Sequence, residues 1–175
     1  MRRILPLLLL LGCPGAPDDS NVLSSEECDA CDACLIENLE IGFAGHDSDL
    51  RDYDDLPPAG GDHNPCWAEW AVYDTELPDE NWVHNLEHGG IVYLYDCPGG
   101  CEAEVAELQE IFDSREAGTV IVTPYAGLDG GFAVVAWGWR MVTDCFDRPA
   151  FDAFYDDHVD QAPESVRSGP SASCP

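Results

Sequence analysis

Two histidines and a glutamate lie within five residues of one another, at His84, Glu87 and His88. On a helix, residues four positions apart share a face, and a residue three positions away lies beside them. Both imidazoles can then bind one metal ion, because His-x-x-x-His is a helical chelate. The string also matches the His-x-x-Glu-His pattern of inverted zinc peptidases, in which the glutamate activates water. The segment predicts a metal-binding site and, as a minor alternative, a zinc-dependent hydrolase with Glu87 as its base.

Other side chains can complete such a site. His63 is the strongest further candidate, because it lies in a loop rich in glycine and proline that can approach closely. His158, near the end of the chain, and Met141 are weaker candidates; a thioether ligand would favour copper. His46 is expected to be solvated in the acidic loop 46–55. Imidazole suits zinc and copper alike, so the sequence predicts one of these two ions without choosing between them.

A third interpretation gives the histidines no ligand. In it, the protein is a non-catalytic extracytoplasmic binding or scaffold module, and the histidines form structural hydrogen bonds. A bound metal distinguishes this interpretation from the other two, and turnover of a substrate distinguishes the enzyme from the metal-binding protein. No serine lies in a nucleophile-elbow motif, so serine hydrolase chemistry has no support in the sequence.

The charge of the chain is extreme. It has 35 acidic residues against seven basic ones, all arginine, which gives a formal net charge of −28. A field of this sign repels nucleic acid and attracts cations, so we expect no nucleic-acid partner. The acidic loop 46–55 lacks the glycine and the closing glutamate of an EF-hand loop.

The N-terminus has the pattern of a lipoprotein signal. Arg2 and Arg3 precede an apolar stretch that is too short to span a bilayer. Leu10-Leu11-Gly12-Cys13 then resembles a bacterial lipobox. We therefore expect a signal peptide at 1–12, a lipid on Cys13 and export of the chain. The lipid would anchor the protein to the cell envelope, at the periplasmic face of the outer membrane or at the cell surface.

Cysteine usage fits an exported protein. Eight cysteines remain after Cys13, and an even number in such a compartment predicts disulfides. Cys97 and Cys101 flank a Pro-Gly-Gly turn and are expected to pair. Cysteines three apart can instead bind zinc or an iron–sulfur cluster, but outside the cytoplasm oxidation is favoured. The disulfide candidates are Cys28, Cys31, Cys34, Cys66, Cys97, Cys101, Cys145 and Cys174.

Periodicity and breaker residues predict the elements that carry these side chains. A helix of about ten residues is expected to begin with Asp79 as N-cap and to end at Gly89, with further helices over 102–115 and 149–159. The expected strands are 39–44, 70–73, 91–95, 119–123 and 132–137, the last with an extension towards 142. The fold class is α+β: an antiparallel or mixed sheet of about five strands, two to three helices on one face, and disulfides that staple it. The segments are a signal peptide at 1–12, an acidic cysteine-containing tether at 13–34, a single domain at 35–165 and a tail at 166–175.

Several separated motifs together resemble one bacterial family, the domain of unknown function 3105. The resemblance covers about residues 39–165 and implies that His63, Glu87 and the pair His84/His88 occupy motif positions. It carries no settled activity, although members are often exported or membrane-anchored. The many cysteines and the acidity of this chain depart from the family pattern. The motifs are Pro57 to His63, Val83 to Gly89, Ala136-Trp137-Gly138, Phe154 and Pro163-Glu164.

Overall fold

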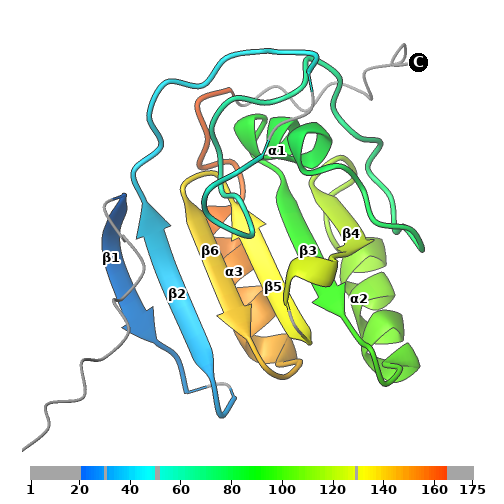
Figure 1. Ribbon diagram of the computed structural model, residues 1–175. Helices are drawn as coiled ribbons and strands as arrows, with labels where there is room; N and C mark the ends of the chain where they lie inside the picture. Colours follow the sequence, from blue (N-terminus) through cyan, green and yellow to red (C-terminus); the bar gives the residue numbers. More distant parts are fainter. Residues whose placement is uncertain (1–20, 30, 50–51, 129, 165–175) are drawn as a thin grey trace, which may run out of the picture.

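A six-stranded mixed sheet forms the centre of the fold in the computed structural model, which describes residues 21–29, 31–49, 52–128 and 130–164 (Figure 1). The strand order is β1-β2-β6-β5-β3-β4, and three α-helices accompany the sheet, which confirms the α+β class. The elements are β1 (Val22–Glu27), β2 (Cys34–Leu39), α1 (Asp79–Glu87), β3 (Ile91–Asp96), α2 (Glu102–Ser114), β4 (Val120–Pro124), the 3-10 turn η1 (Ala126–Leu128), β5 (Gly131–Ala136), β6 (Trp139–Thr143) and α3 (Arg148–His158).

β3 and β4 are the parallel pair of the sheet, and α2 is the crossover between them. A parallel pair needs such a long connection, whereas the other neighbours are antiparallel. α2 buries Leu108 and Ile111 and exposes its acids, as its amphipathic pattern predicts. The helices predicted at 79–88, 102–115 and 149–159 are all confirmed, although Pro78 is the N-cap of α1 and Asp79 is its first residue.

The sheet is covered on both faces, because successive strand residues point to opposite sides. Ile91 and Tyr93 of β3 pack with α2 and α3, whereas Val92 and Leu94 pack with Trp82 and Leu86 of α1. The expectation that the helices share one face is therefore wrong: α2 and α3 cover one face, and α1 with the long connection from β2 covers the other. Burial on both sides explains why these strands are continuously apolar.

Three predicted strands differ from the structure. The sheet begins with β1, inside the segment that the sequence assigned to the tether, and the predicted strand 39–44 shares only Leu39 with β2. The segment 70–73 forms a single bridge, between Val72 and Val122, rather than a strand. The segment 132–142 is a hairpin, because the chain reverses at Trp137 and Gly138 and β6 returns beside β5.

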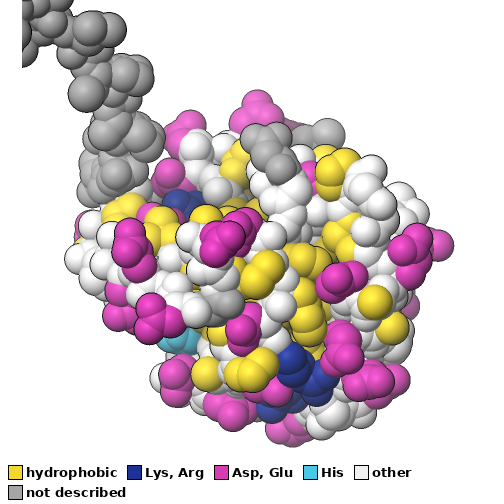
Figure 2. Space-filling model, turned by 90° about the horizontal axis from the view of Figure 1, so that it is seen from below, with side chains coloured by type: hydrophobic (Ala, Val, Ile, Leu, Met, Phe, Trp, Pro, Cys, Tyr) yellow, Lys and Arg dark blue, Asp and Glu magenta, His cyan; other side chains and the backbone are white. Residues whose placement is uncertain are grey.

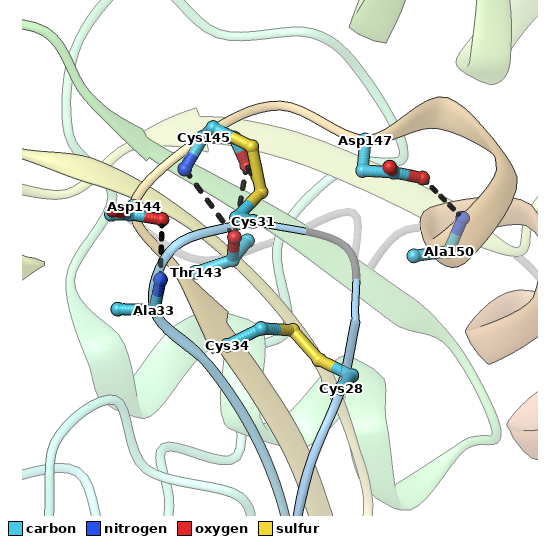
Figure 3. The surroundings of a disulfide bond; sticks show 9 residues. All are labelled: Cys28, Cys31, Ala33, Cys34, Thr143, Asp144, Cys145, Asp147 and Ala150. Atoms are coloured by element: carbon cyan, nitrogen blue, oxygen red, sulfur yellow. Dashed lines mark hydrogen bonds between the residues drawn. A yellow bond between two sulfur atoms is a disulfide. The ribbon is translucent and has the colours of Figure 1, made fainter.

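Disulfides fasten the first hairpin to the rest of the sheet. Cys28 pairs with Cys34 across the turn between β1 and β2, and Cys31 pairs with Cys145 just after β6 (Figure 3). The predicted Cys97–Cys101 bridge is confirmed. Cys66 is also disulfide-bonded, whereas Cys13 and Cys174 lie outside the described residues.

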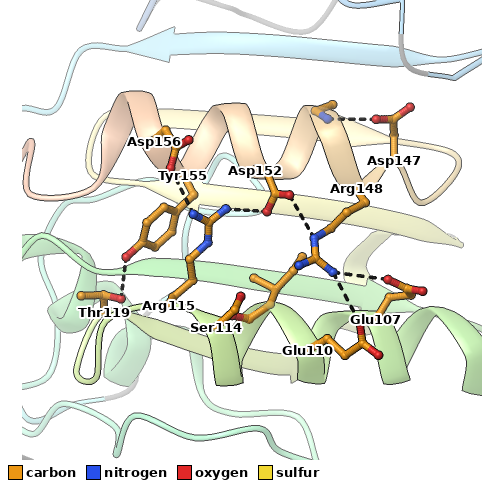
Figure 4. A network of polar contacts seen from close by, with 12 residues as sticks. Glu107, Glu110, Ser114, Arg115, Thr119, Asp147, Arg148, Asp152, Tyr155 and Asp156 are labelled. Atoms are coloured by element: carbon orange, nitrogen blue, oxygen red, sulfur yellow. Dashed lines mark hydrogen bonds and ion pairs between the residues drawn. The ribbon is translucent and has the colours of Figure 1, made fainter.

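Arginines tie α2 to α3. Arg115 pairs with Asp152 and, at 3.1 Å, with Asp156, while its guanidinium lies 4.1 Å from the centroid of the Tyr155 ring (Figure 4). Arg148 pairs with the same Asp152 at 3.1 Å. On the face of the molecule shown in Figure 2, acidic side chains lie at many separate places, and basic side chains occupy only small areas. Within the described ranges, none of the helices has the length and apolarity needed to cross a bilayer.

Candidate metal centre

The end of α1 fixes where the histidines point. The helix stops at His88, and the next residue, Gly89, has φ +84°, a conformation that favours glycine. Its N–H donates to the Leu86 carbonyl at 2.9 Å, and the Gly90 N–H donates to the Asn85 carbonyl at 3.0 Å. A Cβ on Gly90 would lie 2.4 Å from the Trp70 ring, so the backbone passes directly against that indole. The two glycines therefore turn the chain from α1 into β3 within two residues.

Asn85 holds the preceding loop against α1. Its buried amide accepts from the Ala68 N–H at 2.9 Å and donates to the Ala68 carbonyl at 3.0 Å. This places Asn64 over the helix, where its carbonyl accepts a hydrogen bond from His84 Nδ1 at 2.7 Å. With the proton on Nδ1, Nε2 of His84 carries a lone pair, and this atom faces Nε2 of His88. A hydrogen bond from Nδ1 to a carbonyl orients most metal-binding imidazoles.

His63 is oriented in the same way. Its Nδ1 donates to the Gly61 carbonyl at 2.8 Å, so its Nε2 also carries a lone pair. That Nε2 lies 3.0 Å from Oε2 of Glu87. Both atoms are buried, and neither has a hydrogen-bond partner among the described residues. Two acceptors that face each other at this distance repel unless a proton or a metal ion lies between them.

His46 joins the cluster from the loop after β2. The Asp47 N–H donates to the His63 carbonyl at 2.8 Å, and the His63 N–H donates to the Gly45 carbonyl at 3.0 Å, so the two histidine-bearing segments form a short parallel bridge. The His46 ring centroid lies 4.8 Å from those of His63 and His84. Its Nε2 is 3.7 Å from Glu87 Oε2. The ring is therefore a neighbour of the buried pair, although its side chain is 48 % exposed.

His88 lies on the other side of His84. The two Nε2 atoms are 3.0 Å apart and the rings are stacked. Because His84 carries its proton on Nδ1, His88 Nε2–H is the donor of this contact. His88 Nδ1 lies 3.9 Å from Oε2 of Glu164, and the Glu164 N–H donates to the Glu87 carbonyl at 3.0 Å. The indole of Trp67 covers His88, with ring centroids 4.1 Å apart.

Burial keeps His84 uncharged. Desolvation lowers its pKa to about 4, the Asn64 hydrogen bond opposes this shift, and the neighbouring His63, His88 and His46 lower the pKa further. At neutral pH, His84 is therefore a neutral imidazole, which is the form that binds a metal.

Four donor atoms lie within 4.8 Å of one another, on His46, His63, His84 and Glu87, and this His/Glu group could hold a metal ion. Adjacent ligand atoms around a tetrahedral zinc ion are about 3.3 Å apart. The observed separations of 3.0 Å, from His63 to Glu87 and from His84 to His88, are close to this spacing. Imidazole nitrogens with one carboxylate oxygen are ligands for zinc or copper.

Two weaker candidates lie elsewhere. His158 and Met141 line a separate pocket of about 290 Å³ on the face covered by α3, where His158 stacks on Trp139 with ring centroids 4.6 Å apart. Burial lowers the pKa of His158. A second group with metal-compatible spacing contains Cys31 and Cys145, but these two cysteines are joined in a disulfide.

His46 is the site residue that sequence reasoning missed. It was expected in solvent, and it is half exposed, yet its ring completes the cluster. The sequence holds one signal: each of the two histidines lies in a short loop string with a glycine and an aspartate, Gly45-His46-Asp47 and Gly61-Asp62-His63. In the structure these strings are in contact, because the Gly45 N–H donates to Asp62 Oδ1 at 2.9 Å. Four of the five histidines of the chain thus converge.

No curated protein and no solved structure gives a significant match to the chain. A family model described as "Protein of unknown function (DUF3105)" matches residues 46–171. The matched range begins at His46 and contains every donor of the cluster, whereas β1 and β2 precede it. The match spans well over half of the sequence, and the chain therefore belongs to the DUF3105 family.

Proposed function

We propose that this protein is a cell-envelope lipoprotein that binds one zinc or copper ion at the His/Glu cluster. His63, His84 and Glu87 supply the central ligands. A neighbouring histidine supplies the fourth, either His88, as the helical spacing predicts, or His46, which belongs to the same donor group. The observation that carries the proposal is the approach of His63 Nε2 to Glu87 Oε2, two buried acceptors 3.0 Å apart without hydrogen-bond partners among the described residues. A metal ion between them satisfies both lone pairs at once.

The alternative in which the histidines are purely structural does not explain all of their contacts. Structural histidines use both ring nitrogens in hydrogen bonds, as buried polar groups generally do. His84 does so, with Nδ1 on the Asn64 carbonyl and Nε2 against Nε2 of His88. His63 instead uses Nδ1 for the Gly61 carbonyl and directs into the cluster an Nε2 that has no hydrogen-bond partner among the described residues. In both rings the Nδ1 hydrogen bond to a carbonyl is of the kind that orients metal-binding imidazoles.

The hydrolase alternative needs Glu87 as a base beside a metal-bound water. Glu87 Oε2 instead faces a ring nitrogen of His63, in the position of a ligand. Binding is therefore the activity that the geometry favours, with zinc and copper as the ions that the donor set suits.

Metal titration tests the proposal. Zinc and copper(II) are added separately to the metal-free protein at moderate salt, where screening suppresses diffuse attraction to the acidic surface. We expect one tight equivalent in the wild type and a loss of at least about 100-fold in affinity for His63→Ala and His84→Ala. His158→Ala, a histidine outside the cluster, is the control and should bind as the wild type does. Equal affinity in all four proteins would overturn the proposal.

Localisation has a separate test, because its support is the string Leu10-Leu11-Gly12-Cys13, which lies outside the described residues. Mass spectrometry of the mature protein should show an acylated N-terminal Cys13. A Cys13→Ser variant should be released or remain unprocessed. Recovery of a mature, unlipidated chain that begins elsewhere would contradict the anchor.

A further inference from the structure

The cluster contains more donors than one ion uses. His46, His63, His84, His88, Glu87 and Glu164 all direct a nitrogen or oxygen towards it or lie at its edge. A tetrahedral zinc ion takes four ligands. With His63, His84 and Glu87 as central ligands, either His46 or His88 can supply the fourth, so one of these two histidines is in excess, and His46 is the more exposed of the two. A role is therefore needed for a histidine that lies within reach of the ion and is not required to hold it.

His46 differs from the other histidines in exposure and restraint. Its side chain is 48 % exposed, whereas that of His63 is 1 % exposed and that of His88 is 11 % exposed. Backbone carbonyls fix the rings of His63 and His84, but none of the described carbonyls accepts from the His46 ring. Its backbone is held by the bridge to His63. The backbone of His46 is thus held in place, and its half-exposed ring lies between solvent and Glu87.

The fold has covalent cross-links that do not depend on an ion. The disulfides Cys28–Cys34, Cys31–Cys145 and Cys97–Cys101 cross-link the chain without it. The hydrogen bonds that orient the central imidazoles are also made without it, so binding requires little ordering of the chain. A structural zinc site, by contrast, supplies the folding free energy of its domain. The centre has the features of a site from which an ion can leave.

We infer that His46 is an exchange ligand that passes the metal ion between solvent and the buried donors, so that the ion is exchangeable cargo. This inference rests on the proposed function. An arriving hydrated ion first exchanges a water for His46 Nε2. It then moves the short distance to Glu87 Oε2, 3.7 Å away, and to His63 and His84, whose rings adjoin that of His46. Exposed acids in the loop that follows His46, namely Asp49, Asp52 and Asp54, raise the cation concentration near it.

Rates distinguish an exchange ligand from a fixed one. Stopped-flow measurements on the full chain give the association rate of zinc and the release rate into excess EDTA, and a competition titration gives the affinity. In His46→Ala we expect both rates to fall by the same factor, on the order of ten, with an affinity within about twofold of wild type, because a relay speeds both directions equally. His46→Asp should restore the rates, since a carboxylate also captures zinc.

Each other outcome overturns the inference. Faster release with unchanged association makes His46 a fixed ligand, and unchanged rates make it a bystander. Absence of a tight zinc equivalent in the wild type overturns the proposed function itself, and this inference with it. His158→Ala is the control for loss of a histidine, because its ring stacks on Trp139 away from the cluster.

Discussion

Glu87 Oε2 lies 3.0 Å from Nε2 of His63, with both atoms buried and the His63 proton committed to the Gly61 carbonyl. With neither a proton nor a metal ion between them, a carboxylate and an imidazole lone pair that face each other raise the free energy of the protein. The same contact lowers the free energy of the metal-bound protein, because a cation satisfies both atoms. A substitution at this pair that stabilises the metal-free protein should therefore lower its affinity for metal.

Glu87→Gln should separate these two quantities. The amide can donate to His63 Nε2 and no longer carries a buried charge, so we expect the metal-free protein to gain about 1–2 kcal/mol in its free energy of unfolding. Zinc affinity should fall by at least about 100-fold, since a ligand is lost. Urea unfolding in EDTA and zinc titration measure the two effects. Glu164→Gln, at a half-exposed carboxylate, is the stability control; a Glu87→Gln protein that binds zinc as tightly as the wild type contradicts this account.

Asp79 gives the fold a pH dependence. Burial raises its pKa to about 6, against a hydrogen bond from Tyr125 that lowers the pKa, and nearby Glu76 raises it further. The folded state therefore binds this proton more tightly than the unfolded state, and stability is lost as pH rises from about 4 to about 6. Asp79→Asn should abolish that loss and stabilise the protein above pH 6 by about 1–2 kcal/mol, after allowance for partial exposure of the carboxyl.

Unfolding by urea at several pH values measures this effect. The matched control is Glu102→Gln, because Glu102 is also an acid in the first turn of a helix but is exposed. Its pH profile should follow that of the wild type. An Asp79→Asn protein whose stability still falls between pH 4 and pH 6 would assign the dependence to other groups.

Gly90→Ala tests the close passage at the end of α1. The new Cβ would lie 2.4 Å from the Trp70 ring and 2.9 Å from the Asn85 carbonyl oxygen. We expect a loss of about 2–3 kcal/mol in the free energy of unfolding, because a packed aromatic ring and the backbone must move. Gly99→Ala, where a Cβ meets nothing within 4 Å, should change stability by less than about 0.5 kcal/mol. If thermal unfolding shows the same loss of stability for both substitutions, the Trp70 ring moves aside at little cost and the prediction is contradicted.

The disulfides should differ in their contribution to stability. Cys31 and Cys145 are 114 residues apart in sequence, whereas Cys97 and Cys101 are four apart. The longer closed loop removes more entropy from the unfolded chain, so Cys31→Ser/Cys145→Ser should cost about 3 kcal/mol more than Cys97→Ser/Cys101→Ser. Denaturant unfolding of the two double variants measures the difference. Equal losses would mean that local packing outweighs loop closure.

Local signals predicted the elements that carry the central donors. α1 (Asp79–Glu87) and the strand that follows could be predicted from an acid at the start of the helix, the periodicity and the two glycines, although Pro78 and not Asp79 is the N-cap. Helical spacing alone predicts that His84, Glu87 and His88 lie next to one another on the helix surface. The position of His63 near them was an expectation from loop composition, and the structure brings it to Glu87.

Long-range pairing explains what the sequence did not show. β1 is polar and exposed, so it has no hydrophobic run, and only its register with β2 makes it a strand. The position of His46 depends on backbone hydrogen bonds to His63, 17 residues away in sequence, which no local pattern encodes. One local pattern does indicate that a helix covers the second face of the sheet. Ile91 to Leu94 are apolar at every position, which is typical of a strand that is buried on both faces.

The disulfides of the first hairpin also determine how the molecule responds to force. Tension applied at the N-terminal end reaches β1 first and can peel its six residues away from β2, which lengthens the chain by roughly 20 Å. Peeling stops at Cys28, because its bond to Cys34 transfers the load to the start of β2, and Cys31 transfers load to Cys145 after β6. The first hairpin can therefore extend only until these disulfides carry the load, and the histidine cluster lies in the part of the chain that follows them.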